Sequence, residues 1–229
     1  FAESLFNELP ESYKEKETLN SMVPIWKKSK SEVTKEEYEE FYKSNFFDNE
    51  APIKTIQTSV EGAVDFKAIL FIPKNPPYNY YSKQYEKGLK LYTNGVMIME
   101  RCSDLIPDYF SFVKGVVDSE ITLNISRETV QQTRQIKAIS QSIEKKVKSE
   151  LLDLQKNNRE DYEKFYESFG VQLKFGIYQS FGMNKDALQD LLLFYSLKQD
   201  KMVTLKEYVD NNDSDIYYVS GKSVAGIKA

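Results

Sequence analysis

The longest regular pattern in the chain is a row of aliphatic residues that recur every three or four positions. Charged and polar residues separate its members, which are Val130, Ile136, Ile139, Ile143, Val147, Leu151 and Leu154. This spacing places one apolar stripe along a helix of about seven turns. The pattern therefore predicts a long helix that begins near Glu128 and ends at the polar residues 156–160.

Three apolar runs before this helix have the character of strands. Residues 53–60 and 64–72 flank Glu61-Gly62, a tight-turn signal, so they are expected to pair as an antiparallel hairpin. Residues 89–99 are expected to form one further strand, with a bulge at Asn94-Gly95.

Two capping boxes mark the starts of shorter helices. They are Thr34-x-x-Glu37 and Thr204-x-x-Glu207, in which the two side chains bond to backbone N–H groups that the helix leaves unpaired. The aromatic residues that follow the first box are expected to face the core: Tyr38, Phe41 and Tyr42.

The remaining elements are predicted from shorter patterns. Residues 107–113 are expected to form a short helix, and residues 161–181 an amphipathic one. Residues 184–195 carry leucines on one helical face. Residues 215–219 are expected to form a strand, and a last helix follows from Ser223.

Composition excludes several classes of protein. The formal net charge is −4 and the pI about 5.2, which argues against a general nucleic-acid binder because such a protein needs a basic face. No apolar run approaches the ~18 residues of a membrane span. Residues 1–20 do not have the pattern of a signal peptide.

The chain lacks the residues that most often carry catalysis. It has no histidine, which removes the commonest general base and zinc ligand. Its one cysteine, Cys102, allows no internal disulfide and suits a reducing cytoplasm. Cys102 is expected to pack in the core. Any catalytic contribution must therefore come from charge and position.

Arg127 is the candidate for such a contribution. Among 31 basic residues, arginine occurs at only four positions, and Arg127 lies at the expected start of the long helix. A cation there is disfavoured by the helix dipole unless an anion such as a phosphate binds as well. The alternative, favoured by spacing alone, is that Arg127 pairs with Asp118, Glu120 or Glu128.

One phosphate-binding motif is suggested and then disfavoured. Residues 220–223, with the sequence SGKS, resemble the tail of a P-loop, but Ile216 occupies the position of its first glycine. The acidic residues are scattered without metal-ligand spacing, so we expect no metal site. The sequence therefore predicts no nucleotide pocket within this chain.

Several short runs along the chain match one known family. The central runs are 105–109 (LIPDY), 112–119 (FVKGVVDS), 123–128 (LNISRE) and 131–132 (QQ). Others include 24–26 (PIW), 68–73 (AILFIP) and 216–218 (IYY). Together they resemble the middle domain of the 90-kDa heat-shock protein chaperones, most of all its bacterial HtpG type. The resemblance covers nearly the whole chain after about Met22.

The resemblance implies an α/β fold of the α+β kind. Its parts are a larger α/β/α sandwich, a helical coil connection and a smaller α/β unit. We accordingly expect a linker at residues 1–21, the larger subdomain with the catalytic loop at 22–155, the connecting helical segment at 156–200, and the start of the smaller subdomain at 201–229. The ATP pocket and the dimerisation domain would belong to other parts of a longer protein.

The resemblance also implies a site. In the family, the arginine of the loop that matches residues 123–128 reaches the γ-phosphate of ATP, which the N-terminal domain binds with Mg²⁺. By that match Arg127 is the catalytic arginine. Asn124 and Gln131 match polar residues that support the arginine or the phosphate. Trp26 matches a tryptophan implicated in client contact, with simple packing as the alternative.

The implied function is that of a molecular chaperone of the stress response in the cytoplasm. The implied partners are the protein's own N-terminal ATPase and C-terminal dimerisation domains, unfolded clients and co-chaperones, within a homodimer and without nucleic acid or membrane. The isolated chain is expected to be inactive as an ATPase. The alternative function is a non-catalytic docking module. Thr93, Asn94, Gly95 and Met97 depart from the family, in which many members carry basic residues and a phenylalanine there.

Overall fold

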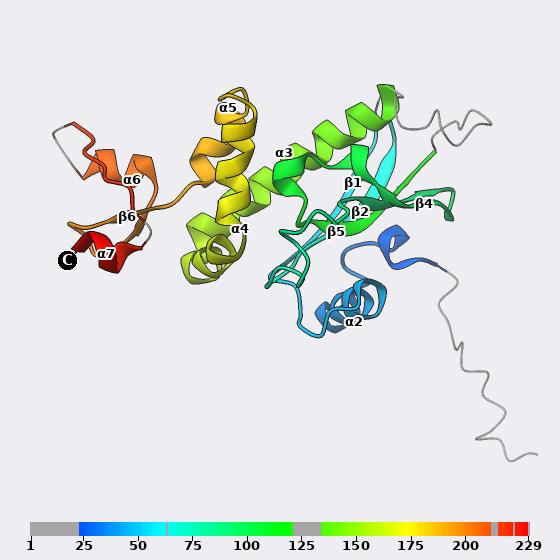
Figure 1. The fold of residues 1–229 in the computed structure, drawn as a ribbon. Coiled ribbons are helices and arrows are strands. Elements are labelled where there is room, and N and C mark those ends of the chain that lie inside the picture. The colour runs from blue at the N-terminus through cyan, green and yellow to red at the C-terminus, as the bar shows by residue number, and fades with distance from the viewer. Residues whose placement is uncertain (1–22, 63, 121–133, 212–214, 222, 229) are drawn as a thin grey trace, which may run out of the picture.

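A computed structural model describes residues 23–62, 64–120, 134–211, 215–221 and 223–228 (Figure 1). At its centre is a five-stranded sheet in the order β1-β2-β5-β3-β4. The strands are β1 (Lys54–Val60), β2 (Phe66–Ile72), β3 (Leu89–Thr93), β4 (Val96–Cys102) and β5 (Lys114–Ser119). All neighbours are antiparallel except β3 and β5, which pair in parallel.

The first predicted hairpin is confirmed and the third strand needs correction. β1 and β2 pair antiparallel with Val60 opposite Phe66. The prediction of one bulged strand over residues 89–99 is wrong, because the chain reverses at Asn94-Gly95 and forms the β3–β4 hairpin. Asn94 and Gly95 have φ angles of 52° and 82°, which is the backbone of a type I′ turn and favours this dipeptide.

Helices cover both faces of the sheet, which confirms the expected sandwich. Alternate residues of β2 divide between two cores, since Ile69 and Phe71 pack with α2 (Lys35–Phe46) and with η2 (Ile25–Lys27), a single turn of 3₁₀ helix. Ala68, Leu70 and Ile72 face the other way, into the core that α3 (Arg134–Asn157) and α4 (Arg159–Gln179) share. This alternation is what a strand buried on both faces requires.

The long helix is confirmed over its described part. Six of the seven predicted stripe residues in α3 are buried, from Ile136 to Leu154, and Val130 lies outside the described residues. Asn158 alone separates α3 from α4, and its side chain accepts a hydrogen bond from the Asp161 amide. The core continues across this junction, because Phe112 before β5 packs against Phe165 and Phe169 of α4.

Shorter elements follow α4. They are α5 (Lys185–Leu188), η6 (Gln189–Leu191), β6 (Phe194–Ser196), β7 (Lys201–Val203), α6 (Leu205–Asp210) and α7 (Val224–Lys228). The helix expected over residues 184–195 therefore ends at Leu191, and Tyr195 lies in a strand. Residues 215–219 form no strand, contrary to expectation. Both predicted capping boxes are present, at Thr34 and Thr204.

Two single 3₁₀ turns connect β4 to β5. They are η3 (Ser103–Leu105) and η4 (Asp108–Phe110), so the helix expected at residues 107–113 is reduced to one turn. Cys102 is fully buried, as predicted, and burial raises the pKa of its thiol. It packs in the core and remains protonated at neutral pH.

Candidate functional site

The candidate site lies where β5 ends. Strand β5 stops at Ser119, and the next segment, residues 121–133, lies outside the described residues. Asn124, Arg127 and Gln131 are all in that segment. Of this site, the structure therefore describes only the residues around the end of β5, here called the frame: Trp26, Lys27, Gly95 and Asp118. The roles of Asn124, Arg127 and Gln131 stay predictions.

Asp118 organises this frame. Its side chain is only 5% exposed, yet three groups from distant parts of the chain reach it. Trp26 Nε1 donates to Oδ2 at 3.0 Å, Lys27 Nζ lies 3.1 Å from Oδ2, and the Gly95 amide donates to Oδ1 at 3.3 Å. The carboxylate therefore joins η2, the β3–β4 turn and β5 at one point. This satisfies a buried charge that would otherwise be costly.

Trp26 occupies a packed position in this frame. It is 8% exposed, and its ring centroid lies 4.9 Å from that of Tyr92 and 6.1 Å from that of Phe41. Burial, with the charge of Asp118 as a smaller cause, raises the pKa of Tyr92, so its phenol stays neutral. Trp26 anchors η2 to the sheet. Its expected contact with clients stays a prediction.

A second set of contacts fixes the turn between β1 and β2 to the same end of β5. Ser119 Oγ donates to the Asp65 carbonyl at 2.6 Å, and the Gly62 amide donates to Asp65 Oδ1 at 2.7 Å. A hollow of about 520 Å³ opens beside these residues. Its charged lining has both signs: Lys27, Lys67, Glu61, Asp65, Asp118 and Glu120.

The described residues offer neither a metal centre nor a phosphate loop. No group of three or more His, Cys, Asp or Glu side chains in this part of the chain is placed to hold a metal ion. The P-loop interpretation of residues 220–223 loses its preceding strand, since residues 215–221 have no regular structure. No described helix is long and apolar enough to cross a membrane.

Comparison with known proteins decides the family. A family model described as Hsp90 protein matches residues 4–229. The chain belongs to the Hsp90 family. Its Hsp90 relatives include the chaperone protein HtpG of Clostridium botulinum, 58% identical over 217 residues, and that of Alkaliphilus oremlandii, 57% identical over 217 residues. Each match covers 93% of this chain and 35% of the relative, so the chain spans about a third of their length.

A solved structure shows which part of Hsp90 the fold resembles. The middle domain of a putative heat shock protein from Plasmodium falciparum matches with a TM-score of 0.73 at 29% sequence identity. The match covers 85% of this chain and 76% of that one. The sandwich described above is accordingly the fold of an Hsp90 middle domain.

Sequence reasoning missed the part that Asp118 plays in this Hsp90 chain. The sequence suggests Asp118 only as a partner for Arg127, whereas its carboxylate is bound by Trp26, Lys27 and Gly95. One signal is present in the sequence, namely a carboxylate inside an apolar strand, which implies that partners come from elsewhere. Which partners they are depends on tertiary packing.

Proposed function

We propose that this chain is the middle segment of an ATP-dependent Hsp90 chaperone and that Arg127 completes the ATPase site of a separate N-terminal domain. The observation that carries the proposal is the family match over residues 4–229, together with the family's arginine motif at residues 123–128. The coverage of about a third of each relative supports a longer protein in which other domains supply the nucleotide pocket.

The proposed chemistry is electrostatic. ATP and Mg²⁺ are held mainly by the N-terminal domain, and Arg127 neutralises charge that develops on the transferred phosphoryl group. A guanidinium suits this role because it is always charged and presents a planar fork of donors. Asn124 and Gln131 hold the arginine or meet the phosphate. A spacing of four residues would place Arg127 and Gln131 on one face of the helix that the sequence predicts.

The frame around Asp118 supports this role. An arginine that acts across a domain interface needs a rigid base, because a small misplacement costs much of its effect. Strand β5 lies in the middle of the five-stranded sheet, between β2 and β3. Contacts of Asp118 and Ser119 fix its end. Arg127 follows this fixed point by eight residues in the sequence.

The test compares full-length chaperones that differ at one arginine. Arg127→Ala should lower ATP turnover about a thousandfold or more, the range seen when an arginine finger is lost, while nucleotide affinity stays unchanged. Arg134→Ala is the matched control, since Arg134 opens the described part of α3 and is exposed. Turnover of Arg127→Ala within about twofold of wild type would reject the catalytic role.

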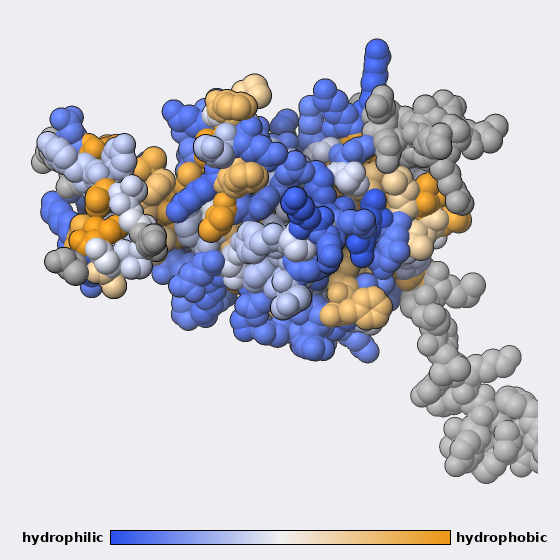
Figure 2. All heavy atoms as spheres, in the orientation of Figure 1, coloured by the Kyte–Doolittle hydropathy of each residue, from blue (hydrophilic) through white to orange (hydrophobic). Residues whose placement is uncertain are grey.

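A client-binding surface is the second part of the proposal, and a docking module without catalysis is its alternative form. The observation that favours such a surface is a set of exposed apolar side chains around the α4–α5 turn: Phe175, Tyr178, Phe181 and Met183. Figure 2 shows hydrophobic side chains gathered over this region and over the C-terminal elements. Exposed apolar groups of this kind mark interaction sites.

The same proposal includes the location and the oligomeric state of the full-length protein. The full-length chaperone works as a cytoplasmic homodimer with co-chaperones, and the isolated chain has no ATPase activity. Adding a purified N-terminal domain to this chain separates the two alternatives. Recovery of ATP hydrolysis that depends on Arg127 supports the catalytic form, whereas client binding that survives Arg127→Ala without any hydrolysis supports the docking form.

A further inference from the structure

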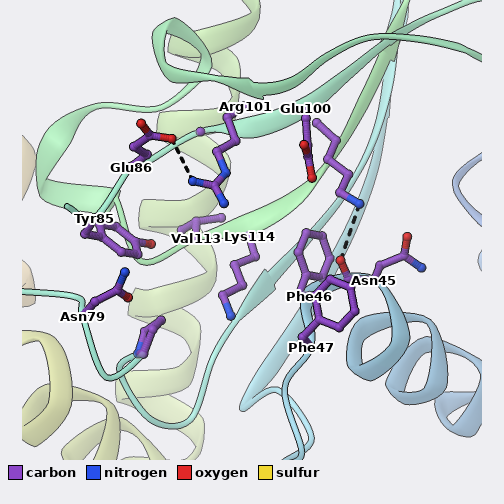
Figure 3. Close-up of a pocket in the computed structure, with 13 residues that line it drawn as sticks. Asn45, Phe46, Phe47, Asn79, Tyr85, Glu86, Glu100, Arg101, Val113 and Lys114 are labelled. Atoms are coloured by element: carbon purple, nitrogen blue, oxygen red, sulfur yellow. Dashed lines mark hydrogen bonds and ion pairs between the residues drawn. The ribbon is translucent and has the colours of Figure 1, made fainter.

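A second hollow lies at the opposite end of β5 from Asp118. It has a volume of about 220 Å³ and opens between the C-terminal end of α2, the starts of β3 and β5 and the end of β4. Figure 3 shows the Lys114 side chain between Tyr85 and Asn79 on one side and Phe46 and Phe47 on the other. The hollow therefore places the ammonium group of Lys114 near the aromatic rings of Tyr85, Phe46 and Phe47.

Lys114 is a cation with an incomplete set of partners. Its side chain is 18% exposed, and the nearest carboxylate oxygen, Asp48 Oδ2, lies 3.8 Å from Nζ. That distance is too long for a hydrogen bond. The same Asp48 oxygen already accepts a hydrogen bond from the Tyr42 hydroxyl at 2.6 Å. Within the described parts of the chain, the three N–H donors of Lys114 bond to no protein group.

Partial burial disfavours the charged form of the Lys114 side chain. Desolvation lowers the pKa of Lys114, and Asp48 offsets this only in part. The ring of Tyr42 lies 5.7 Å from Nζ and adds a weak attraction. A half-buried ammonium with unfilled donors is stabilised when an anion arrives, because the anion supplies both charge and hydrogen bonds.

Lys90 supplies a second donor to the same hollow. Its Nζ makes one long hydrogen bond of 3.4 Å to the Asn45 carbonyl and lies 5.4 Å from the centroid of the Phe46 ring. Arg101, in contrast, is already bound to Glu86 at 2.9 Å. Among the described cations that line the hollow, Lys114 and Lys90 are therefore the two without a carboxylate at hydrogen-bond distance. Glu86 and Glu100 at its edge disfavour a doubly charged anion.

Phe47, on the aromatic side of the hollow, has an unusual backbone conformation. Phe47 ends α2 in the left-handed region with φ 53°, and its side chain is 93% exposed. Left-handed backbone favours glycine or asparagine, so a phenylalanine there is strained. The result is an exposed ring at the rim of a hollow that contains two lysines. Such a ring can cover an apolar group that adjoins an anion.

We propose that this hollow is a binding site for a peptide carboxylate with an adjoining apolar side chain. Lys114 and Lys90 hold the carboxylate, and Phe46 and Phe47 contact the apolar group. The carboxylate comes either from a chain terminus or from an internal acidic residue. This site is independent of the ATPase proposal, because none of its residues belongs to the frame around Asp118.

Three small probes test the chemistry of the ligand, with ¹H–¹⁵N spectra of this chain as the readout. N-acetylphenylalanine carries a terminal carboxylate, acetyl-Asp-Phe-amide an internal one, and N-acetylphenylalanine amide none. Either acid should shift the amides of Phe47, Gly88 and Lys114, and the one that binds more tightly identifies the source. The neutral amide should bind about tenfold more weakly or not at all. Equal binding of the amide, or tighter binding of inorganic phosphate, overturns the proposal.

Two lysine variants test the residues. Lys114→Met and Lys90→Met should each weaken binding of the better acid about tenfold, the effect of one charge-assisted hydrogen bond. Lys137→Met, an exposed lysine on α3, should leave binding unchanged. Thermal melting establishes that each variant is folded, and Lys90→Met carries the test if Lys114→Met is not. Unchanged affinity in a folded Lys114→Met or Lys90→Met variant contradicts the site.

Discussion

Trp26 and Asp118 are hydrogen-bonded to each other over 3.0 Å although 92 residues separate them in the sequence. The bond joins η2, which precedes the first helix on the sheet, to the end of its central strand. Lys27 and the Gly95 amide bind the same carboxylate. A single buried charge therefore fixes three segments at the end of β5, which precedes residues 121–133 in the sequence.

Removing that charge should destabilise the fold. Asp118→Asn keeps one oxygen but loses the charge that binds Lys27, so we expect unfolding free energy to fall by about 1–3 kcal/mol. Urea unfolding measures the change. Glu120→Gln is the matched control, since Glu120 is exposed and has no bonded partner in the described chain. Equal stability of the two variants would mean that the Asp118 contacts contribute nothing.

Lys114 gives a prediction that depends on pH. Burial lowers its pKa from the ordinary value of 10.5. The nearby charge of Asp48 raises that pKa, but by less. The folded state therefore binds the proton less tightly than the unfolded state, which destabilises the protein at any pH below the lowered pKa. This cost disappears as pH rises toward 10.5.

Lys114→Met should consequently be more stable than wild type at neutral pH, with a difference that narrows as pH rises. The charged and titratable groups around Lys114 remain in both proteins. They are Asp48, Tyr42, Tyr85, Lys90, Glu86, Glu100 and Arg101. Chemical denaturation at several pH values measures the gap. A gap that is constant with pH, as expected for Lys137→Met, would contradict this sign.

Arg159 joins α4 to the C-terminal elements. Its guanidinium binds Glu207 through two nitrogens, at 3.1 and 3.0 Å, and donates to the Met202 carbonyl at 3.0 Å. Arg159→Ala should therefore loosen α6 and β7 by about 1–2 kcal/mol while the five-stranded sheet stays intact. Hydrogen exchange should accelerate in these two elements and stay unchanged in the sheet. Lys164→Ala, whose partners lie on its own helix, is the control.

The contact between Arg159 and Glu207 should weaken at acidic pH. Burial raises the pKa of Glu207, but hydrogen bonds from Thr204 and Arg159 outweigh it and hold that pKa below its usual range. The stabilisation is present above the usual carboxyl pKa and is lost as pH falls through the lowered one. Exchange in α6 should accelerate at that acidic pH in wild type and change less in Arg159→Ala.

Gly115 tests the close approach of two strands. A Cβ on Gly115 would lie 2.3 Å from the Ile69 carbonyl oxygen and 2.9 Å from Leu70 Cα. Backbone atoms cannot move aside, so Gly115→Ala should cost about 3 kcal/mol. Gly62→Ala is the matched control, because nothing lies within 4 Å of its Cβ position. A thermal melt that changes equally in both variants would contradict the packing described.

The elements that could be predicted are those with local signals. The apolar stripe of α3, the turn between β1 and β2 and both capping boxes depend on residues a few positions apart. The Asn94-Gly95 turn also has a local signal, which a continuous apolar run conceals. The leucines of residues 188–193 fit a helix, but Leu192 is extended because the chain there leaves the helical layer and enters β6.

The site is less accessible to prediction from residues alone. The catalytic role of Arg127 is predicted only through the family resemblance, since its spacing suits an ion pair as well. The three partners of Asp118 come from two segments far from it in the sequence, η2 and the β3–β4 turn, and no local pattern specifies them. Lys114 likewise looks like any surface lysine in the sequence. Only the packing of α2 and of the segment that contains Asn79 and Tyr85 around it partly buries its side chain.

The position of β5 in the sheet has a consequence for how the protein is made. β5 is the last of the five strands in the sequence, yet it lies between β2 and β3. A nascent chain can form the β1–β2 and β3–β4 hairpins first, but each keeps an open edge until β5 inserts between them. Open strand edges pair readily with other chains. During its own synthesis this chain therefore exposes strand edges of β2 and β3 that only the later strand β5 covers.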